Sequence, residues 1–442
     1  MGNSNNNNKK ENKSNNSNYN IYIIICYCLE ESKLNIKDIN FKEFTQELAN
    51  EFSNYSINKE KILSNENNSF LANDEIFKNT DINFECIEYA PKIFAYLRSL
   101  DRISNDDIIR SFLPMFNEKI IAKNDGGRSG NLFLQTMNGK YLLKTITLNE
   151  LNFIRSQFLY NYVNYIKDNN DSLINRIYGI YELQNQKFLK NESIYLLLMR
   201  NLYGIFNEEN VIVKFDLKGS SFDREIKTNE QVIQSDVLKD ENFRKRERVL
   251  YLNNNDSELV KKILIKDSEF LKSIGIMDYS LFVVKISISE IENKFFFGEK
   301  FIKNQNDFKL LLLKKFKNKD FEYAYKILSN FSFEKSDKYK TKILNDDLSF
   351  KKQDLKGLEK YIFPHIDEKY IYIISIIDFF QLYDTQKKIE TVLKSIIAEK
   401  EEISSLDVPE YQKRFENFIK QITDFSEIIK NYYLIINKEN DF

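Results

Sequence analysis

The sequence predicts an α+β protein, because helix-like and strand-like patterns occupy different parts of one long chain. Its 442 residues suffice for one large two-lobed domain or for two to three ordinary ones. Residues 30–115 show helical segments separated by loops rich in Asn and Ser, and from about residue 125 strands with glycines follow. We expect a helical region over Phe84–Leu100, interrupted at Pro91, and a buried strand over Ile21–Leu29, which is rich in β-branched and aromatic residues.

Composition disfavours several classes of function. The net charge is −1, so the chain is no polycation and no nucleic-acid partner is expected. Three cysteines, Cys26, Cys28 and Cys86, form no disulfide framework and favour a reducing, cytoplasmic location. A single histidine, His365, argues against a zinc site and against histidine-dependent catalysis. If the protein is an enzyme, carboxylates and lysines are therefore the expected catalytic groups.

Two segments differ in composition from the rest of the chain. Residues 1–20 contain ten asparagines and are expected to be a disordered tail. The tail starts with Met1-Gly2 like a myristoylation signal, but Asn6 replaces the usual Ser or Thr. Residues 299–360 contain 16 lysines and 10 acidic residues, a net charge of +6. We expect a mobile basic insertion there, between the strand-like segments Leu281–Ile288 and Tyr370–Ile377.

A glycine-rich loop leads into a predicted hairpin that carries a lysine. Asn138-Gly139 between two apolar runs is typical of a type I′ turn, and its register would place Phe133 opposite Lys144. Backbone N–H groups of the preceding loop, DGGRSGN, could reach phosphate oxygens without a Cβ in the way. The segment fits a phosphate clamp, but a plain hairpin with a snorkelling lysine explains it equally well.

Two carboxylates and a second lysine end or interrupt hydrophobic strands. Asp278 lies within GIMDYSLFVV, Asp378 is expected to be buried at the end of a strand, and Lys218 follows the strand Val211–Phe215. Phosphoryl transfer needs such a set: cations for the phosphates, a carboxylate for Mg²⁺ and a carboxylate for the attacking hydroxyl. Taken singly, Lys218 could pair with Asp216 at the surface and Asp378 could cap a helix.

Four motifs occur in an order that resembles one family. The phosphatidylinositol phosphate kinases have signatures that resemble GGRSGNLF…LLKTI, FDLKGSSFDRE, GIMDYSLFVV and IIDFF…DTQKKIE…YQKRFENFI, over about residues 84–422. The resemblance implies a two-lobed kinase-like fold. An N-terminal extension (21–83) would precede an N-lobe with an antiparallel sheet (84–202) and a mixed α/β C-lobe (203–432). It also implies ATP as co-substrate, Mg²⁺ as cofactor, and a phosphoinositide in an anionic membrane as substrate. The enzyme would be cytoplasmic, peripherally associated with the cytosolic face of a membrane.

The resemblance also implies roles for individual residues. Lys144 would hold the nucleotide phosphates, Asp278 would orient and deprotonate the inositol hydroxyl, and Asp378 would bind Mg²⁺. Lys218 would reach the phosphates of ATP and of the lipid, and Arg224 would contact the lipid phosphate, for which a guanidinium is suited. The remaining ATP-binding residues would be those of the glycine loop and of a hinge against the adenine: Gly126, Gly127, Ser129, Gly130, Asn131, Met199, Asn201 and Leu202.

Three positions depart from the family pattern or are not fixed by it. Phe282 stands where Leu is usual, and Asn131 replaces a common Ser. The motifs do not fix the glutamate that would pair with Lys144, and Glu150 is the nearest candidate.

The segment 379–408 resembles the specificity segment of the family. Its apolar residues recur at helical spacing, which predicts either a core-facing helix or an amphipathic helix in the membrane interface. We favour the interface, with Lys387 and Lys388 meeting anionic headgroups. Glu390 lies two residues after the lysine pair, and a glutamate at this position resembles the pattern of the enzymes that phosphorylate the 5-hydroxyl. The 3-phosphate 5-kinases share this glutamate, but they would carry a zinc-finger or chaperonin-like region that the N-terminal half does not show. We therefore expect phosphatidylinositol 4-phosphate to be converted to phosphatidylinositol 4,5-bisphosphate.

Three alternatives stay open at this point. The chain could be a phosphatidylinositol 5-phosphate 4-kinase, a catalytically weak membrane-binding scaffold of the same fold, or a soluble inositol polyphosphate kinase. The apolar run Ile21–Leu29 could also pair across a homodimer.

Overall fold

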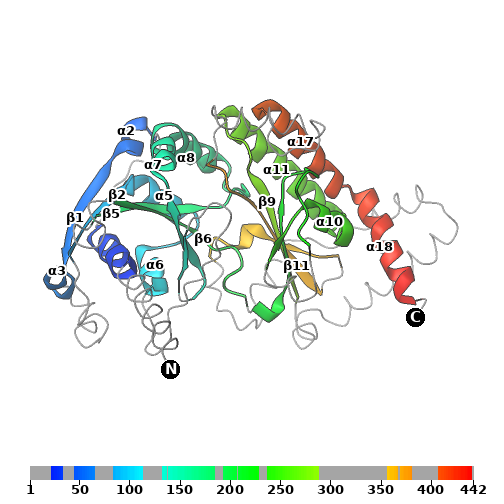
Figure 1. Cartoon of the computed structure of the whole chain (residues 1–442), viewed down its shortest axis with the longest axis horizontal. Coiled ribbons are helices and arrows are strands. Elements are labelled where there is room, and N and C mark those ends of the chain that lie inside the picture. Colours follow the sequence, from blue (N-terminus) through cyan, green and yellow to red (C-terminus); the bar gives the residue numbers. More distant parts are fainter. Residues whose placement is uncertain are drawn as a thin grey trace, which may run out of the picture. The chain divides into compact units, whose positions relative to one another are not determined.

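The computed structural model describes residues 21–32, 44–64, 83–112, 132–136, 138–184, 193–206, 208–227, 236–287, 356–366, 369–380 and 407–440. The chain divides into two compact units (Figure 1). Unit 1 consists of Met1–Asn170 and Asn175–Ile205, and unit 2 of Asp171–Ile174 and Phe206–Phe442.

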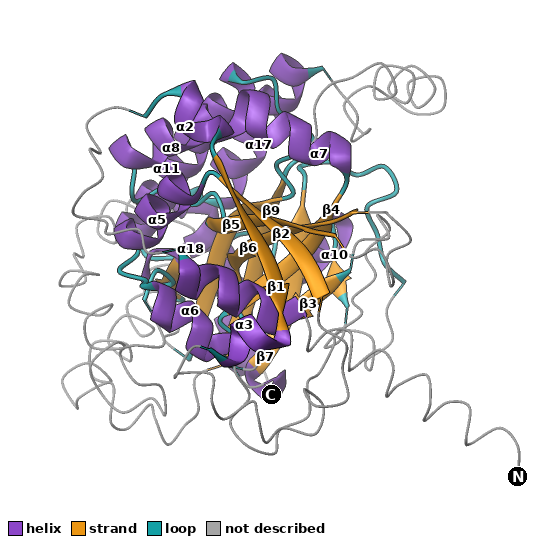
Figure 2. Cartoon of the chain, turned by 90° about the vertical axis from the view of Figure 1, so that its left-hand side faces the viewer, coloured by secondary structure: helices purple, strands orange, loops and turns teal. Residues whose placement is uncertain are grey.

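Unit 1 is built on a six-stranded antiparallel sheet with the strand order β1-β2-β5-β6-β4-β3 (Figure 2). The strands are β1 (Phe52–Asn58), β2 (Asn83–Tyr89), β3 (Phe133–Gln135), β4 (Tyr141–Ile146), β5 (Ile177–Gln184) and β6 (Ser193–Arg200). The helices are residues 21–31, α2 (Gln46–Asn50), α3 (Lys59–Leu63), α5 (Pro91–Leu100), α6 (Asn105–Phe112), α7 (Leu148–Phe153), the π-helical η3 (Ile154–Phe158) and α8 (Leu159–Asp168). The expected antiparallel sheet is thereby confirmed.

The segment over residues 21–31 is a helix, so the strand predicted for Ile21–Leu29 is wrong. Ile24 and Cys28 are fully buried in one apolar cluster with Leu134 and Leu143 of the sheet. A helix that is buried on all sides is apolar all round, and periodicity alone cannot distinguish it from a buried strand. Because these side chains are buried within unit 1, they are not available for the suggested pairing across a homodimer.

The predicted helical region Phe84–Leu100 is half strand and half helix. β2 covers Asn83–Tyr89 and pairs with both β1 and β5, so pairing within the sheet outweighs local preference. α5 begins at Pro91, where the missing N–H of proline costs no helical hydrogen bond. Pro91 therefore starts the helix, and does not interrupt one.

Strands β3 and β4 form the predicted hairpin in the predicted register, with Phe133 opposite Lys144. The turn is not of type I′, which needs a left-handed backbone at both central residues. Gly139 has φ of +71°, and the Thr136 N–H donates to the Tyr141 carbonyl at 3.0 Å, although a two-residue turn at Asn138-Gly139 would leave this pair without a hydrogen bond. The carbonyl of Thr136 accepts a hydrogen bond from the Gly139 N–H at 2.9 Å, which closes a different turn without shifting the strand register.

Unit 2 is built on a five-stranded mixed sheet with the strand order β10-β11-β9-β7-β8. The strands are β7 (Val211–Leu217), β8 (Val237–Leu238), β9 (Ser280–Ser287), β10 (Ile362–Pro364) and β11 (Tyr370–Ile377), and only the β7–β8 pair is parallel. The helices are η4 (Glu208–Asn210), α10 (Asp240–Arg246), α11 (Asn254–Ser273), η6 (Glu359–Tyr361), α17 (Val408–Ile422) and α18 (Phe425–Asn440). Figure 1 shows α11 and α17 side by side.

The three strands predicted in this half of the chain are confirmed as β7, β9 and β11. Most of the predicted basic insertion, residues 299–355, lies outside the described residues. Its last residues, 356–360, form a turn and the start of η6, with Leu358 buried. The sheet resumes with β10 at Ile362, two residues after the predicted end of the insertion.

His365 is the only histidine of the chain and is buried in unit 2. The rings of Tyr251, Tyr370 and Tyr372 surround it at centroid distances of 5.4, 5.3 and 5.4 Å. Burial lowers the pKa of His365 well below its ordinary value, and the Lys285 ammonium acts in the same direction. The imidazole therefore stays neutral in the folded protein at pH values where it is protonated in the unfolded chain.

We expect the protein to be about 1.4 kcal/mol less stable near pH 5.5 than near pH 7.5, because only the unfolded chain binds a proton at His365 below its ordinary pKa of about 6.5. The depressed pKa of a base makes this loss grow as the pH falls. Denaturant unfolding followed by circular dichroism at both pH values measures it. His365→Gln should remove most of the pH dependence, and an equal slope in the variant would assign it to other groups.

Candidate active site

The strand register of unit 2 brings Lys218, Asp278 and Asp378 to the same edge of the sheet. Ser280 of β9 pairs with the last residue of β11, and Leu281 pairs with the last residue of β7. Asp378 directly follows β11, Lys218 directly follows β7, and Asp278 lies just before β9. Residues far apart in the sequence thus lie at the one end of the sheet where β7 and β11 end and β9 begins.

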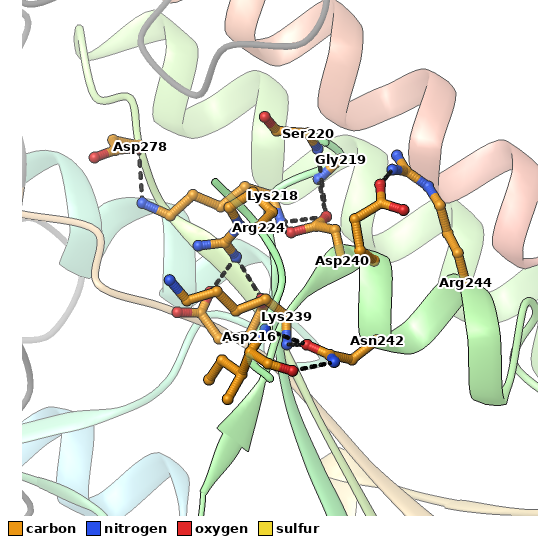
Figure 3. Close-up of polar contacts among 12 residues, drawn as sticks. Asp216, Lys218, Gly219, Ser220, Arg224, Lys239, Asp240, Asn242, Arg244 and Asp278 are labelled. Atoms are coloured by element: carbon orange, nitrogen blue, oxygen red, sulfur yellow. Dashed lines mark hydrogen bonds and ion pairs between the residues drawn. The ribbon is translucent and has the colours of Figure 1, made fainter. Parts of the chain in front are cut away.

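Lys218 and Asp278 form a direct ion pair. The Lys218 Nζ lies 2.7 Å from the Asp278 Oδ1, and the two side chains are 15% and 17% exposed (Figure 3). Asp278 is therefore neither buried without a partner nor fully solvated. The ammonium compensates the cost of partial burial, and the remaining exposure lets solutes reach the carboxylate.

Asp278 and Asp378 both have a left-handed backbone, with φ of +62° and +57°. This conformation is uncommon outside glycine, and Asp and Asn tolerate it better than most residues. Asp378 is exposed, which corrects the expectation that it is buried at the strand end. Its carboxylate is accessible to ions from the solvent.

Helix α17 supports the backbone beside Asp278. The fully buried hydroxyl of Tyr411 donates a hydrogen bond to the carbonyl of Tyr279. The rings of Tyr411 and Phe415 pack edge-on against the Tyr279 ring at centroid distances of 4.9 and 5.0 Å. The motif YQKRFENFI lies on this helix, but the sequence alone predicts no role for its residues. The structure shows that it contacts the residue next to Asp278.

Arg224 is held between two carboxylates. Its Nε donates to the Asp240 Oδ2 at 2.7 Å, and its Nη2 donates to the Asp216 Oδ1 at 3.1 Å and to the Asp216 carbonyl. Burial alone would lower the pKa of Arg224, but the two carboxylates raise it overall. The guanidinium carries five N–H donors, so a contact with a lipid phosphate would have to use those not engaged here.

Asp240 contacts the same loop through its other oxygen and is a residue that sequence reasoning missed. Its Oδ1 accepts hydrogen bonds from the backbone N–H groups of Lys218 at 3.0 Å, Gly219 at 2.7 Å and Ser220 at 3.3 Å. Its side chain is fully buried. The sequence gives little signal for this role, because an Asp at the start of a short helix is usually read as a favourable residue near the helix dipole.

Lys144 lies in unit 1, on β4 between β3 and β6. Lys144 is 8% exposed, and its Nζ lies 5.8 Å from the centroid of the Phe133 ring. Glu150, the glutamate considered as its partner, forms a capping box at the start of α7: its side chain accepts from the Thr147 N–H at 2.7 Å. Glu150 therefore has a structural role at the start of α7 that does not involve Lys144.

The predicted hinge residues follow one another at the end of β6, also in unit 1. Met199, Asn201 and Leu202 are buried, and Met199 pairs with Leu142 on the strand that carries Lys144. The Asn201 N–H donates to the Lys140 carbonyl at 3.0 Å, which ties the segment to the hairpin. Lys144 and the hinge thus belong to neighbouring strands of one sheet.

Eight predicted site residues lie outside the described residues and are not located by the structure. They are Gly126, Gly127, Ser129, Gly130, Asn131, Lys387, Lys388 and Glu390. Within the described ranges, no group of three or more His, Cys, Asp and Glu side chains is arranged to hold a metal ion. In the same ranges, no helix combines the length and the apolar character needed to cross a membrane.

The sequence matches one family model over most of its length. Residues 115–422 match the family described as phosphatidylinositol-4-phosphate 5-kinase, and this range contains Lys144, Lys218, Asp278 and Asp378. The chain therefore belongs to this family. The family resemblance inferred from the four motifs is confirmed.

Individual relatives agree with the family assignment. A phosphatidylinositol 4-phosphate 5-kinase of Plasmodium falciparum is 27% identical over 88% of this chain and 20% of its own length. A phosphatidylinositol 4-phosphate 5-kinase of Schizosaccharomyces pombe is 30% identical over 48% of this chain and 28% of its own length. The mouse phosphatidylinositol 5-phosphate 4-kinase type-2 alpha is 30% identical over 47% of this chain and 49% of its own length. The chain thus spans half or less of each of these relatives.

Proposed function

We propose that this protein is a lipid kinase that transfers the γ-phosphoryl group of ATP to the 5-hydroxyl of phosphatidylinositol 4-phosphate. The product would be phosphatidylinositol 4,5-bisphosphate. The observation that carries the proposal is that Lys218, paired with Asp278, and Asp378 lie at the same end of one sheet, in a chain of this family. Two of the relatives described above are named as enzymes of this specificity.

In the proposed reaction Asp278 orients the inositol hydroxyl and accepts its proton as the bond to phosphorus forms. Before substrate binds, the Lys218 ammonium pairs with this carboxylate at 2.7 Å. Phosphate groups entering the site compete for the Lys218 ammonium, which releases one oxygen of Asp278 for the hydroxyl. Lys218 then neutralises charge on the phosphates as it develops.

Asp378 is the proposed ligand for Mg²⁺. The ion is commonly held by one or two carboxylates together with substrate phosphates and water, so an exposed carboxylate at the strand end fits it. When bound, Mg²⁺ supplies positive charge to the transferring phosphoryl group.

The residues of unit 1 are proposed to bind the nucleotide. Lys144 is assigned to the phosphates of ATP, and the buried residues Met199, Asn201 and Leu202 are assigned to the hinge against the adenine. The glycine loop Gly126–Asn131 is assigned to the phosphates from the sequence alone. Lys144 is mostly buried on β4, and its ammonium is the group that would make this contact.

We also propose that the enzyme is cytoplasmic and binds the cytosolic face of a membrane peripherally. Lys387 and Lys388 precede a predicted amphipathic helix, and each lysine near an anionic surface contributes about 1 kcal/mol to binding. The soluble inositol polyphosphate kinase that the sequence left open would not need this segment. Activity on vesicles but not on free headgroups distinguishes the two.

Lipid specificity is the finer part of the proposal and rests on Glu390. The wild type should prefer phosphatidylinositol 4-phosphate on a panel of monophosphorylated phosphoinositides in vesicles. Glu390→Ala should lower this preference, because the variant loses the glutamate whose position resembles that in enzymes that phosphorylate the 5-hydroxyl. Glu401→Ala, another acidic residue of the segment 379–408, is the control. An unchanged preference in Glu390→Ala would contradict the role of Glu390 in specificity. A wild-type preference for the 5-phosphate lipid would favour the 4-kinase alternative.

A further inference from the structure

The start of α10 holds the loop that carries Lys218 and Arg224 at several points. Besides the bonds of Asp240, the Glu241 N–H donates to the Arg224 carbonyl at 3.0 Å. Asn242 both donates to and accepts from the backbone of Ile226, each at 2.9 Å. Three successive residues of one short helix therefore bind the loop Lys218–Ile226.

The turn at residues 218–220 has the form of an anion-binding nest. Three successive N–H groups point to one place, and Gly219 is left-handed with φ of +69°. Figure 3 shows that the carboxylate of Asp240 lies at this place. On another side, a Cβ added to Gly219 would lie 2.9 Å from the Cβ of Phe418. The turn is thus packed against α17 and its N–H groups already bind an anion of the protein itself.

The same carboxylate fixes the orientation of Arg224. One oxygen of Asp240 binds the turn, and the other binds the Nε of Arg224. Asp216 binds the Nη2 of the guanidinium. Since a guanidinium is planar, two bonds from different nitrogens determine the plane of the group as well as its position.

We infer that Asp240 is a positioning residue, an internal anion that shapes the turn and orients Lys218 and Arg224 toward the substrate. Phosphates of the substrate are then met by these two side chains and not by the N–H groups of the turn, which Asp240 occupies. The inference rests on the proposed lipid-kinase function for its consequence in catalysis. The positioning itself rests only on the contacts within unit 2.

Asp240→Asn separates the two contacts of the residue. The amide oxygen can still accept from the turn, but the amide N–H₂ then faces the Nε–H of Arg224, so that two donors oppose each other. We expect the KM for phosphatidylinositol 4-phosphate in mixed vesicles to rise about tenfold, with the KM for ATP and the fold unchanged, as befits loss of a charge-assisted bond. Asp240→Ala, which loses both contacts, should lower kcat as well.

Glu241→Gln is the matched control, because it removes one carboxylate from the same helical turn. The Glu241 side chain pairs with Arg244, and its backbone N–H to Arg224 is kept in the variant. We expect wild-type kinetics for this control. Equal kinetics in Asp240→Asn and Glu241→Gln would overturn the inference, and so would parallel rises of both KM values in Asp240→Asn.

A double-mutant cycle with Arg224→Gln tests the coupling directly. If Asp240 acts through Arg224, then Asp240→Asn should raise the lipid KM much less on the Arg224→Gln background than alone. Additive effects would refute the inference. The same cycle measured on the melting temperature needs no activity. A wild type without lipid-kinase activity would therefore refute the proposed function, while non-additive melting temperatures would still support the positioning.

Discussion

Asp278→Asn is expected to reduce phosphoryl transfer to the lipid by about 10²- to 10⁴-fold, the range that a general base contributes. Asn can still orient the hydroxyl and accept a hydrogen bond from Lys218, but it cannot take up the proton. It also tolerates the left-handed backbone of position 278, where Ala would be strained. The loss should therefore be in kcat, with the KM for both substrates and the melting temperature little changed.

The measurement is product formation from radiolabelled ATP and vesicles containing phosphatidylinositol 4-phosphate. Glu269→Gln, an exposed carboxylate on α11, is the control and should behave as the wild type. If Asp278→Asn kept more than about a tenth of wild-type kcat, the role of general base would be excluded for this residue.

Asp378→Asn is expected to reduce phosphoryl transfer at ordinary Mg²⁺ concentrations by a factor similar to that for Asp278→Asn. An amide oxygen carries no net charge and binds Mg²⁺ more weakly than a carboxylate, so half-maximal activity should require much more Mg²⁺. Because Asp378 is exposed, the substitution should change the free energy of unfolding by no more than about 0.5 kcal/mol. Activity is measured as a function of Mg²⁺ concentration, with the melting temperature as a check on folding.

The pattern of loss distinguishes Asp378 from Asp278. High Mg²⁺ should partly restore Asp378→Asn but should not restore Asp278→Asn. Restoration of both variants, or an unchanged Mg²⁺ dependence in Asp378→Asn, would contradict the assignment of the metal to Asp378.

The sequence was sufficient where a short-range rule fixes the geometry. Asn138-Gly139 determined the hairpin register that pairs Phe133 with Lys144, even though the turn type differs from the prediction. The strand-like patterns predicted β7, β9 and β11. With their register, these strands explain why Lys218, Asp278 and Asp378 share one edge of the sheet.

The sequence was insufficient where tertiary contacts decide. The run Ile21–Leu29 is apolar throughout, so a buried helix and a buried strand have the same pattern, and only packing in unit 1 distinguishes them. Asp240 looks like an ordinary helix-start residue until the loop Lys218–Ile226 folds back onto it. The exposure of Asp378 depends on the course of the chain after β11, which hydrophobicity along the strand does not report.

The most direct test of the account is to determine which hydroxyl the wild-type protein phosphorylates. The protein is incubated with radiolabelled ATP, Mg²⁺ and vesicles containing phosphatidylinositol 4-phosphate, and the position of the new phosphate is established on the deacylated product. The account predicts phosphatidylinositol 4,5-bisphosphate, formed by the wild type and lost in Asp278→Asn. No labelled lipid, or equal labelling by the wild type and Asp278→Asn, would contradict it.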